Sequence, residues 1–217
     1  MFKTKASRMT GCFRGLVIGG LALVLAVLTA PAGCGKSSGE KTVDDAMALY
    51  QDSWFKEARA AAAGHMNEPG GKLVYHLCQV FDSTALDYSG GLKGLKELYD
   101  DPDVREKQPL VWAEAGLSYA RVILVNQIRA KAENRFQLPE EYTNMDVKPV
   151  FAGIRDRCPQ SAQGAMAVVY LAEAYFAGDD KTDHDTAFDL TEKYLAEYPF
   201  ARETPLVKRY LEQMQGK

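Results

Sequence analysis

The sequence contains few of the residues that most often build metal and catalytic sites. Its 217 residues include only three histidines and four cysteines. His65, His76 and His184 do not share a helix face at a ligand spacing, so we expect no zinc site. No Gly-x-Ser-x-Gly motif or Cys/His pair stands out either, and these are features of nucleophilic hydrolases. We therefore predict a protein that is not an enzyme and needs no metal or other cofactor.

Acidic residues are missing from the first 33 positions of the chain. Lys3, Lys5, Arg8 and Arg14 give this region a positive charge, and an uncharged run rich in Leu, Val and Ala follows over residues 15–30. A positive head, an apolar run and then small residues are typical of an export signal. We predict that residues 1–33 are a signal peptide.

The stretch Ala-Pro-Ala-Gly-Cys-Gly-Lys-Ser, residues 30–37, also fits a loose phosphate-loop pattern. In that interpretation Lys36 would contact the outer phosphates and Ser37 the metal. The flanks oppose it, because a polar tether follows the motif instead of a helix, and no later apolar strand ends in an aspartate that could hold magnesium. The export interpretation is the one that the surrounding residues favour.

Within the export interpretation, Ala32, Gly33 and Cys34 resemble the lipobox of bacterial lipoproteins, although Pro31 departs from the leucine-like residue of that motif. The resemblance implies that Cys34 carries fatty acyl groups such as palmitate, becomes the mature N-terminus and is followed by a polar tether over residues 34–42. It places the protein in the bacterial cell envelope, lipid-anchored on the periplasmic side, with the inner and outer membranes both open. Two alternatives remain: cleavage before Gly33 at an ordinary Ala-x-Ala site, and an uncleaved apolar anchor.

Removal of the signal changes the charge balance of the chain. It takes away four of the 26 Lys and Arg residues and none of the 29 Asp and Glu residues, which leaves a net charge of −7. This balance argues against a nucleic-acid partner.

In an oxidising compartment Cys78 and Cys158 could form a disulfide, but each also fits its position as a small apolar residue on a helix face.

From Val43 onward, apolar residues recur at intervals of three and four, which predicts an all-α domain over residues 43–217. Pro69, Pro102, Pro159 and Pro199 each follow a short helical segment, and breaks are expected at 67–71, 88–91, 100–103, 138–144, 158–161, 178–183 and 198–201. Short helices with short connections pack as antiparallel pairs.

Within these segments the chain resembles the tetratricopeptide repeat, a helix-turn-helix unit of 34 residues. The small and aromatic positions of its pattern are matched by Trp112, Ala115, Gly116 and Tyr119 in one segment, by Ala172, Tyr175, Ala187 and Pro199 in the last repeat, and by Ala46, Leu49, Ala58 and Pro69 in the first. The resemblance implies a degenerate tetratricopeptide-like helical-hairpin solenoid after the signal peptide. An irregular bundle of five or six helices is the alternative.

In this repeat family the first helix of each unit lines a concave surface that binds peptides. Mapped onto this chain, the resemblance suggests Arg121, Glu173 and Phe176 as candidate partner-binding residues. It implies a membrane-anchored periplasmic scaffold lipoprotein that binds other envelope proteins. Self-association through the last helix is possible, and the rival function is that of a periplasmic helical bundle that binds a small ligand.

Overall fold

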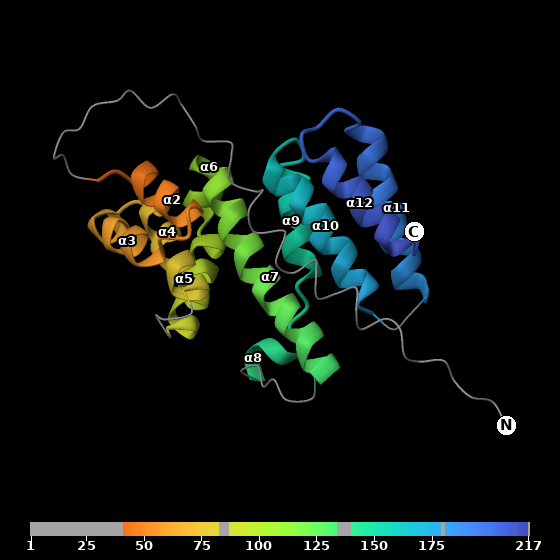
Figure 1. The fold of residues 1–217 in the computed structure, drawn as a ribbon, viewed down its shortest axis with the longest axis horizontal. Helices are drawn as coiled ribbons and strands as arrows, with labels where there is room; N and C mark the ends of the chain where they lie inside the picture. The colour runs from red at the N-terminus through yellow and green to blue at the C-terminus, as the bar shows by residue number, and fades with distance from the viewer. Residues whose placement is uncertain (1–40, 83–86, 134–139, 179–180, 217) are drawn as a thin grey trace. The chain divides into compact units, whose positions relative to one another are not determined.

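The computed structural model describes residues 41–82, 87–133, 140–178 and 181–216. These residues form helices and contain no strand, which confirms the predicted all-α class. Every described helix belongs to the unit Gly39–Lys217 (Figure 1). The predicted signal peptide, Cys34 and most of the tether over residues 34–42 lie outside the described residues.

The described helices are numbered α2 to α12, with one short 3-10 turn, η2. Their bounds are α2 (Val43–Gln51), α3 (Phe55–Ala62), η2 (Ala63–His65), α4 (Pro69–Phe81), α5 (Tyr88–Asp100), α6 (Pro102–Lys107), α7 (Pro109–Glu133), α8 (Glu140–Thr143), α9 (Lys148–Arg157), α10 (Ala162–Phe176), α11 (Lys181–Glu197) and α12 (Thr204–Met214).

Side-chain caps fix where several helices begin. Thr42 and Asp45 form a capping box at the start of α2: the Asp45 backbone N–H donates to Thr42 Oγ1 over 3.2 Å, and the Thr42 N–H donates to Asp45 Oδ2 over 2.9 Å. Ser161 caps α10 in the same manner by accepting from the Gly164 N–H. Such caps satisfy backbone donors that the first helical turn leaves without a partner.

The break expected at residues 88–91 lies elsewhere in the structure. The preceding helix ends at Phe81, and α5 already begins at Tyr88, so Gly90 and Gly91 are inside a helix. A Cβ on Gly91 would lie 2.7 Å from the Val80 side chain of α4. Gly91 therefore permits close packing of α4 on α5 rather than marking a turn.

Three further elements differ from the sequence expectation. The helices α6, α8 and α11 all begin within segments predicted as connections. In α6, Pro102 occupies the first turn and Asp101 accepts from two backbone N–H groups, so the same residues that end α5 start a new helix. Asp183 lies within the first turn of α11, where a negative charge is favourable.

Helix contacts follow the chain in a regular order (Figure 1). We name the helices α2, α4, α7, α10 and α12 the inner series, because each of them contacts the next member of the set. Each of α3, α5, α9 and α11 contacts the inner-series helix before it and the one after it. The contacts therefore link neighbouring hairpins along the whole described unit.

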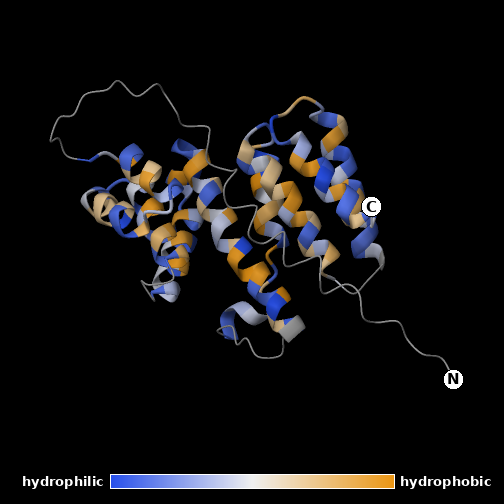
Figure 2. Cartoon of the chain, viewed as in Figure 1, coloured by the Kyte–Doolittle hydropathy of each residue, from blue (hydrophilic) through white to orange (hydrophobic). Residues whose placement is uncertain are grey.

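Helix α10 lies at the centre of the C-terminal hairpins. It contacts α7, α9, α11 and α12, and 12 of its 15 residues are buried. Figure 2 shows α10 as apolar over most of its length, whereas α11 and α12 carry more hydrophilic residues. Gly164 lies at the start of this helix, where an added Cβ would lie only 2.0 Å from the Cys158 carbonyl oxygen. The chain can turn this tightly from α9 into α10 because the position has no side chain.

Candidate functional site

A set of polar residues faces the contact between α7 and α10, and we name it the polar cluster. Its members from α7 are Glu114, Ser118 and Arg121, and those from α10 are Gln163, Tyr170 and Glu173. Spacings of three, four and seven residues bring the members on each helix to one face. Electrostatic interactions add Tyr50 from α2 and Tyr210 from α12. All eight residues therefore come from inner-series helices.

One side of the polar cluster is held by hydrogen bonds to Glu114. The Gln163 side-chain amide donates to Glu114 Oε2 over 3.3 Å, and the Ser118 hydroxyl donates to Oε1 over 3.4 Å. Loss of contact with water raises the pKa of Glu114, while these two hydrogen bonds and the Arg121 charge act in the opposite direction. Glu114 is thus a partly buried carboxylate whose two oxygens both have partners.

Arg121 occupies the middle of the polar cluster. Its guanidinium carbon lies 5.1 Å from the centre of the Tyr170 ring, within the range of a cation–π interaction. Its charge opposes the desolvation that raises the pKa of both Glu114 and Glu173. Among the described residues, however, no side chain forms a hydrogen bond or close ion pair with this guanidinium. Arg121 is partly exposed, so its donors can reach a ligand.

Glu173 is the most unusual member of the polar cluster. Its side chain is only 8% exposed, and within the described part of the chain its carboxylate has neither a hydrogen bond nor an ion pair within 4 Å. Desolvation raises its pKa, and Arg121 opposes that effect only in part. No described polar side-chain atom is both fully enclosed and without a partner, so the Glu173 carboxylate keeps some contact with solvent.

Three tyrosines surround these charges. Tyr50, Tyr170 and Tyr210 are 6%, 6% and 7% exposed. Burial is the main cause of their raised pKa values; the Glu114 charge adds to the effect at Tyr50, and the Glu173 charge adds to it at Tyr210. Their hydroxyls form no hydrogen bonds to the residues that the structure describes. The polar cluster therefore combines aromatic rings with polar groups that a ligand could satisfy.

The structure brings together two of the three predicted partner-binding residues. Arg121 and Glu173 both belong to the polar cluster. Phe176 instead packs on α11, with its ring stacked on His184 at 4.6 Å and edge-on to Phe188 at 6.4 Å between ring centres. Phe176 lies about 60° around α10 from Glu173 at 100° per residue, which turns it toward the neighbouring helix.

The two cysteines suggested as a disulfide are free thiols in the structure, and both are buried. Burial raises the pKa of Cys78 to about 12 and also raises that of Cys158. The Cys158 sulfur lies 3.9 Å from the Pro109 carbonyl oxygen, at the start of α7. The two residues therefore act in this structure as small apolar side chains, with thiols that stay protonated.

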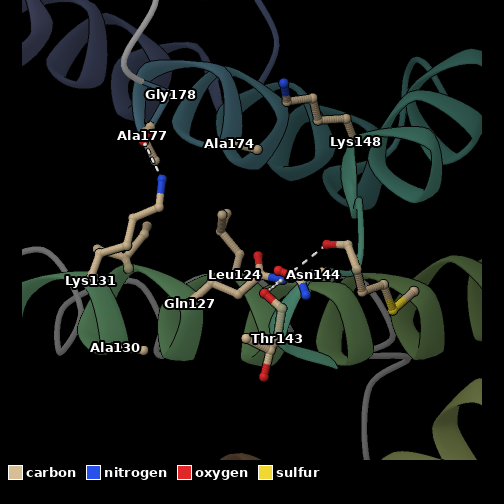
Figure 3. A pocket seen from close by; sticks show the side chains of 12 residues that line it. Leu124, Gln127, Ala130, Lys131, Thr143, Asn144, Lys148, Ala174, Ala177 and Gly178 are labelled. Atoms are coloured by element: carbon tan, nitrogen blue, oxygen red, sulfur yellow. Dashed lines mark hydrogen bonds between the residues drawn. The ribbon is translucent and has the colours of Figure 1, made fainter. Parts of the chain in front are cut away.

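A pocket of about 490 Å³ lies where α7 extends past the start of α9 (Figure 3). Leu124 and Ile128 of α7 and Ala174 of α10 contribute apolar walls. Lys131 donates to the Ala177 carbonyl oxygen over 3.4 Å, whereas Lys148 forms an ion pair with Asp183 and lies 4.5 Å from the Tyr175 ring centre. The pocket thus has a mainly apolar interior and two lysines at its edges.

Sequence reasoning missed several members of the polar cluster. Glu114 lies within the segment that resembles the repeat motif, seven residues before Arg121, so its position on the same helix face was readable from the sequence. Gln163 and Tyr170 precede Glu173 by ten and three residues, which also indicates one face. The inward direction of that face depends on the helix packing, which local spacing does not specify.

Comparisons with protein-family models, curated proteins and solved structures find no match for this chain. Within the described ranges, no helix is long and apolar enough to span a membrane. The same residues contain no group of three or more His, Cys, Asp or Glu side chains placed to hold a metal ion. The polar cluster and the pocket are therefore the features from which a function can be inferred.

Proposed function

We propose that this protein is a lipoprotein of the bacterial cell envelope that acts as a membrane-anchored periplasmic scaffold. Residues 1–33 would direct export, Cys34 would carry the lipid, and residues 43–217 would bind other envelope proteins. The domain would do so as a degenerate tetratricopeptide-like solenoid. Several partners could then be held near one membrane surface, where anchoring raises their effective concentration.

The order of helix contacts supports the solenoid part of this proposal. In tetratricopeptide arrays each hairpin packs on its neighbours, and the first helices of successive hairpins line one surface. The inner series has this relation, since α2, α4, α7, α10 and α12 contact one another in turn. Trp112 and Tyr119, two residues of the motif, lie in α7, which belongs to that series.

The observation that carries the binding proposal is the polar cluster. Buried or partly buried charges without close partners are costly for a protein that uses them only for stability. Arg121 and Glu173 both lack such partners among the described residues, yet both retain access to solvent. The presence of these two charges is explained if a partner protein supplies the missing hydrogen bonds.

Site-specific photocrosslinking in the native host tests this function. A photoreactive amino acid at Gln163, on the partly exposed edge of the polar cluster, should capture one or a few discrete envelope proteins. The same group at Lys193, on the exposed face of α11, provides the control. Arg121→Glu should abolish capture at position 163. Equal capture from both positions, or none from 163, would contradict the proposal.

The pocket in Figure 3 supports a second candidate function, a periplasmic protein that binds a small ligand. Its volume of about 490 Å³ lies within the usual size range of ligand sites. Two edge lysines and an apolar interior suit a small amphipathic acid. A rise in unfolding temperature with such acids, lost in Lys131→Gln, would favour this function over the scaffold.

A further inference from the structure

The charges within the polar cluster do not balance. Glu114 and Glu173 each carry a carboxylate, and Arg121 is the charged group that opposes the rise in the pKa of both. The Glu114 oxygens are satisfied by Gln163 and Ser118. When both acids are ionised, the set therefore lacks one positive charge, and the carboxylate of Glu173 is the one left without a donor.

The surroundings of Glu173 suit a cation that enters from outside. The carboxylate is largely removed from water, which strengthens any charge-assisted hydrogen bond formed there. Tyr210 lies within the electrostatic reach of Glu173, and Tyr170 lies within that of both glutamates. Aromatic rings beside a carboxylate favour a guanidinium or ammonium group over a neutral polar group.

Arg121 does not already fill this role. Its guanidinium is held over the Tyr170 ring. Arg121 and Glu173 both belong to the described part of the chain, and they form no ion pair within 4 Å. The donors of Arg121 are open to an acceptor such as a peptide carbonyl. The polar cluster thus offers an acceptor for a cation and, next to it, donors for the backbone that carries the cation.

We propose that the polar cluster binds a basic side chain, arginine or lysine, presented by an extended segment of the partner protein. Glu173 accepts from the basic group, and Arg121 donates to a backbone carbonyl of the same segment. This inference depends on the scaffold function proposed above and specifies the chemistry of the segment that the surface recognises. It makes charge a criterion for partner choice, because an acidic or neutral side chain leaves Glu173 without a donor.

Matched peptides test the inference on the full-length, detergent-solubilised protein. The probes are three fluorescent nonapeptides of glycine, serine and alanine, acetylated and amidated at their ends, that differ only at the central residue: arginine, citrulline or glutamate. Citrulline keeps the size and planar shape of arginine but lacks its charge and has fewer N–H donors. We expect fluorescence anisotropy to show the arginine peptide binding at least about tenfold more tightly than the citrulline peptide.

Two variants of the protein locate the preference. Glu173→Gln should remove the arginine preference, so that the arginine and citrulline peptides bind equally. Glu192→Gln, an exposed change on α11, should leave it intact. Equal binding of both peptides to the wild type, tightest binding of the glutamate peptide, no detectable binding of any peptide, or a preference that survives Glu173→Gln would each overturn the inference.

The outcome is separable from that of the scaffold proposal. Discrete capture at position 163 together with no charge preference would leave the scaffold function standing and refute the basic-residue inference. An arginine preference that depends on Glu173, with no protein captured in the host, would show a cation site and refute the scaffold.

Discussion

Replacing Glu173 with glutamine should stabilise the protein at neutral and alkaline pH. Glu173 is 8% exposed and its ionised carboxylate has no hydrogen-bond donor among the described residues, so folding removes most of its hydration without providing a replacement. Glutamine has nearly the same shape and carries no charge. The substitution therefore removes the penalty of an ionised group while the surrounding packing is kept.

The size of the effect follows from the environment of the carboxylate. An unsatisfied buried polar group costs about 1–3 kcal/mol, and more when it is charged. The Arg121 charge offsets part of this cost. Because the glutamine side chain is also without a partner, we expect a net gain of about 1–2 kcal/mol in the free energy of unfolding.

The gain should depend on pH with a definite sign. The pKa of Glu173 is raised in the folded state above its ordinary value of 4.5, so the folded protein binds the proton more tightly than the unfolded chain does. The stability cost is therefore present above the folded pKa, falls as the pH decreases through it, and disappears below about 4.5. The difference between the variant and the wild type should follow the same course.

Urea unfolding followed by circular dichroism, at about pH 8 and again near pH 4, measures this difference. Glu192→Gln is the matched control, since the same substitution at an exposed position of α11 should change stability by less than about 0.5 kcal/mol at either pH. Destabilisation by Glu173→Gln at alkaline pH, or a gain that does not change with pH, would refute the reasoning.

Three further predictions concern the fold and the anchor. Gly164→Ala should destabilise the protein by about 1–3 kcal/mol in urea unfolding, because its Cβ would meet the Cys158 carbonyl oxygen. Gly153→Ala, in the open part of α9, should instead stabilise the protein by about 0.5–1 kcal/mol. Similar effects at both positions would contradict the packing. Phe176→Ala should lower stability by about 2 kcal/mol through its lost contacts with α11, yet leave photocrosslinking at the polar cluster unchanged; loss of crosslinking from a folded variant would return Phe176 to the binding surface. Cys34→Ala should move the protein from the membrane to the soluble fraction on cell fractionation; full membrane retention with an intact signal would exclude the lipid anchor.

The sequence was a good guide to the helices and a weaker guide to their limits. The apolar spacing of residues such as Leu73, Leu77 and Val74 indicates a helix without reference to other elements. Gly91 has the same local appearance whether it ends a helix or permits close packing. Only the position of α4 beside it, where an added Cβ would meet Val80, decides between the two.

The polar cluster was predictable in part for a similar reason. The repeat resemblance placed Arg121 and Glu173 toward one surface, and both lie in the polar cluster. Phe176 was assigned to the same surface, but it packs on His184 because α11 covers that side of α10. The burial of Glu173 depends on the packing of α10 against α7, α9, α11 and α12, which forms only on folding.

Hydrogen exchange of the protein with and without the partner captured at position 163 tests whether the polar cluster is the binding surface. We predict slower amide exchange on binding in α7 and α10, the helices that carry the polar cluster, with little change in α3 and α5. We also predict that Arg121→Glu removes this protection. Protection confined to α3, α5 or the pocket beside Lys131 would contradict the claim that the polar cluster is the binding surface.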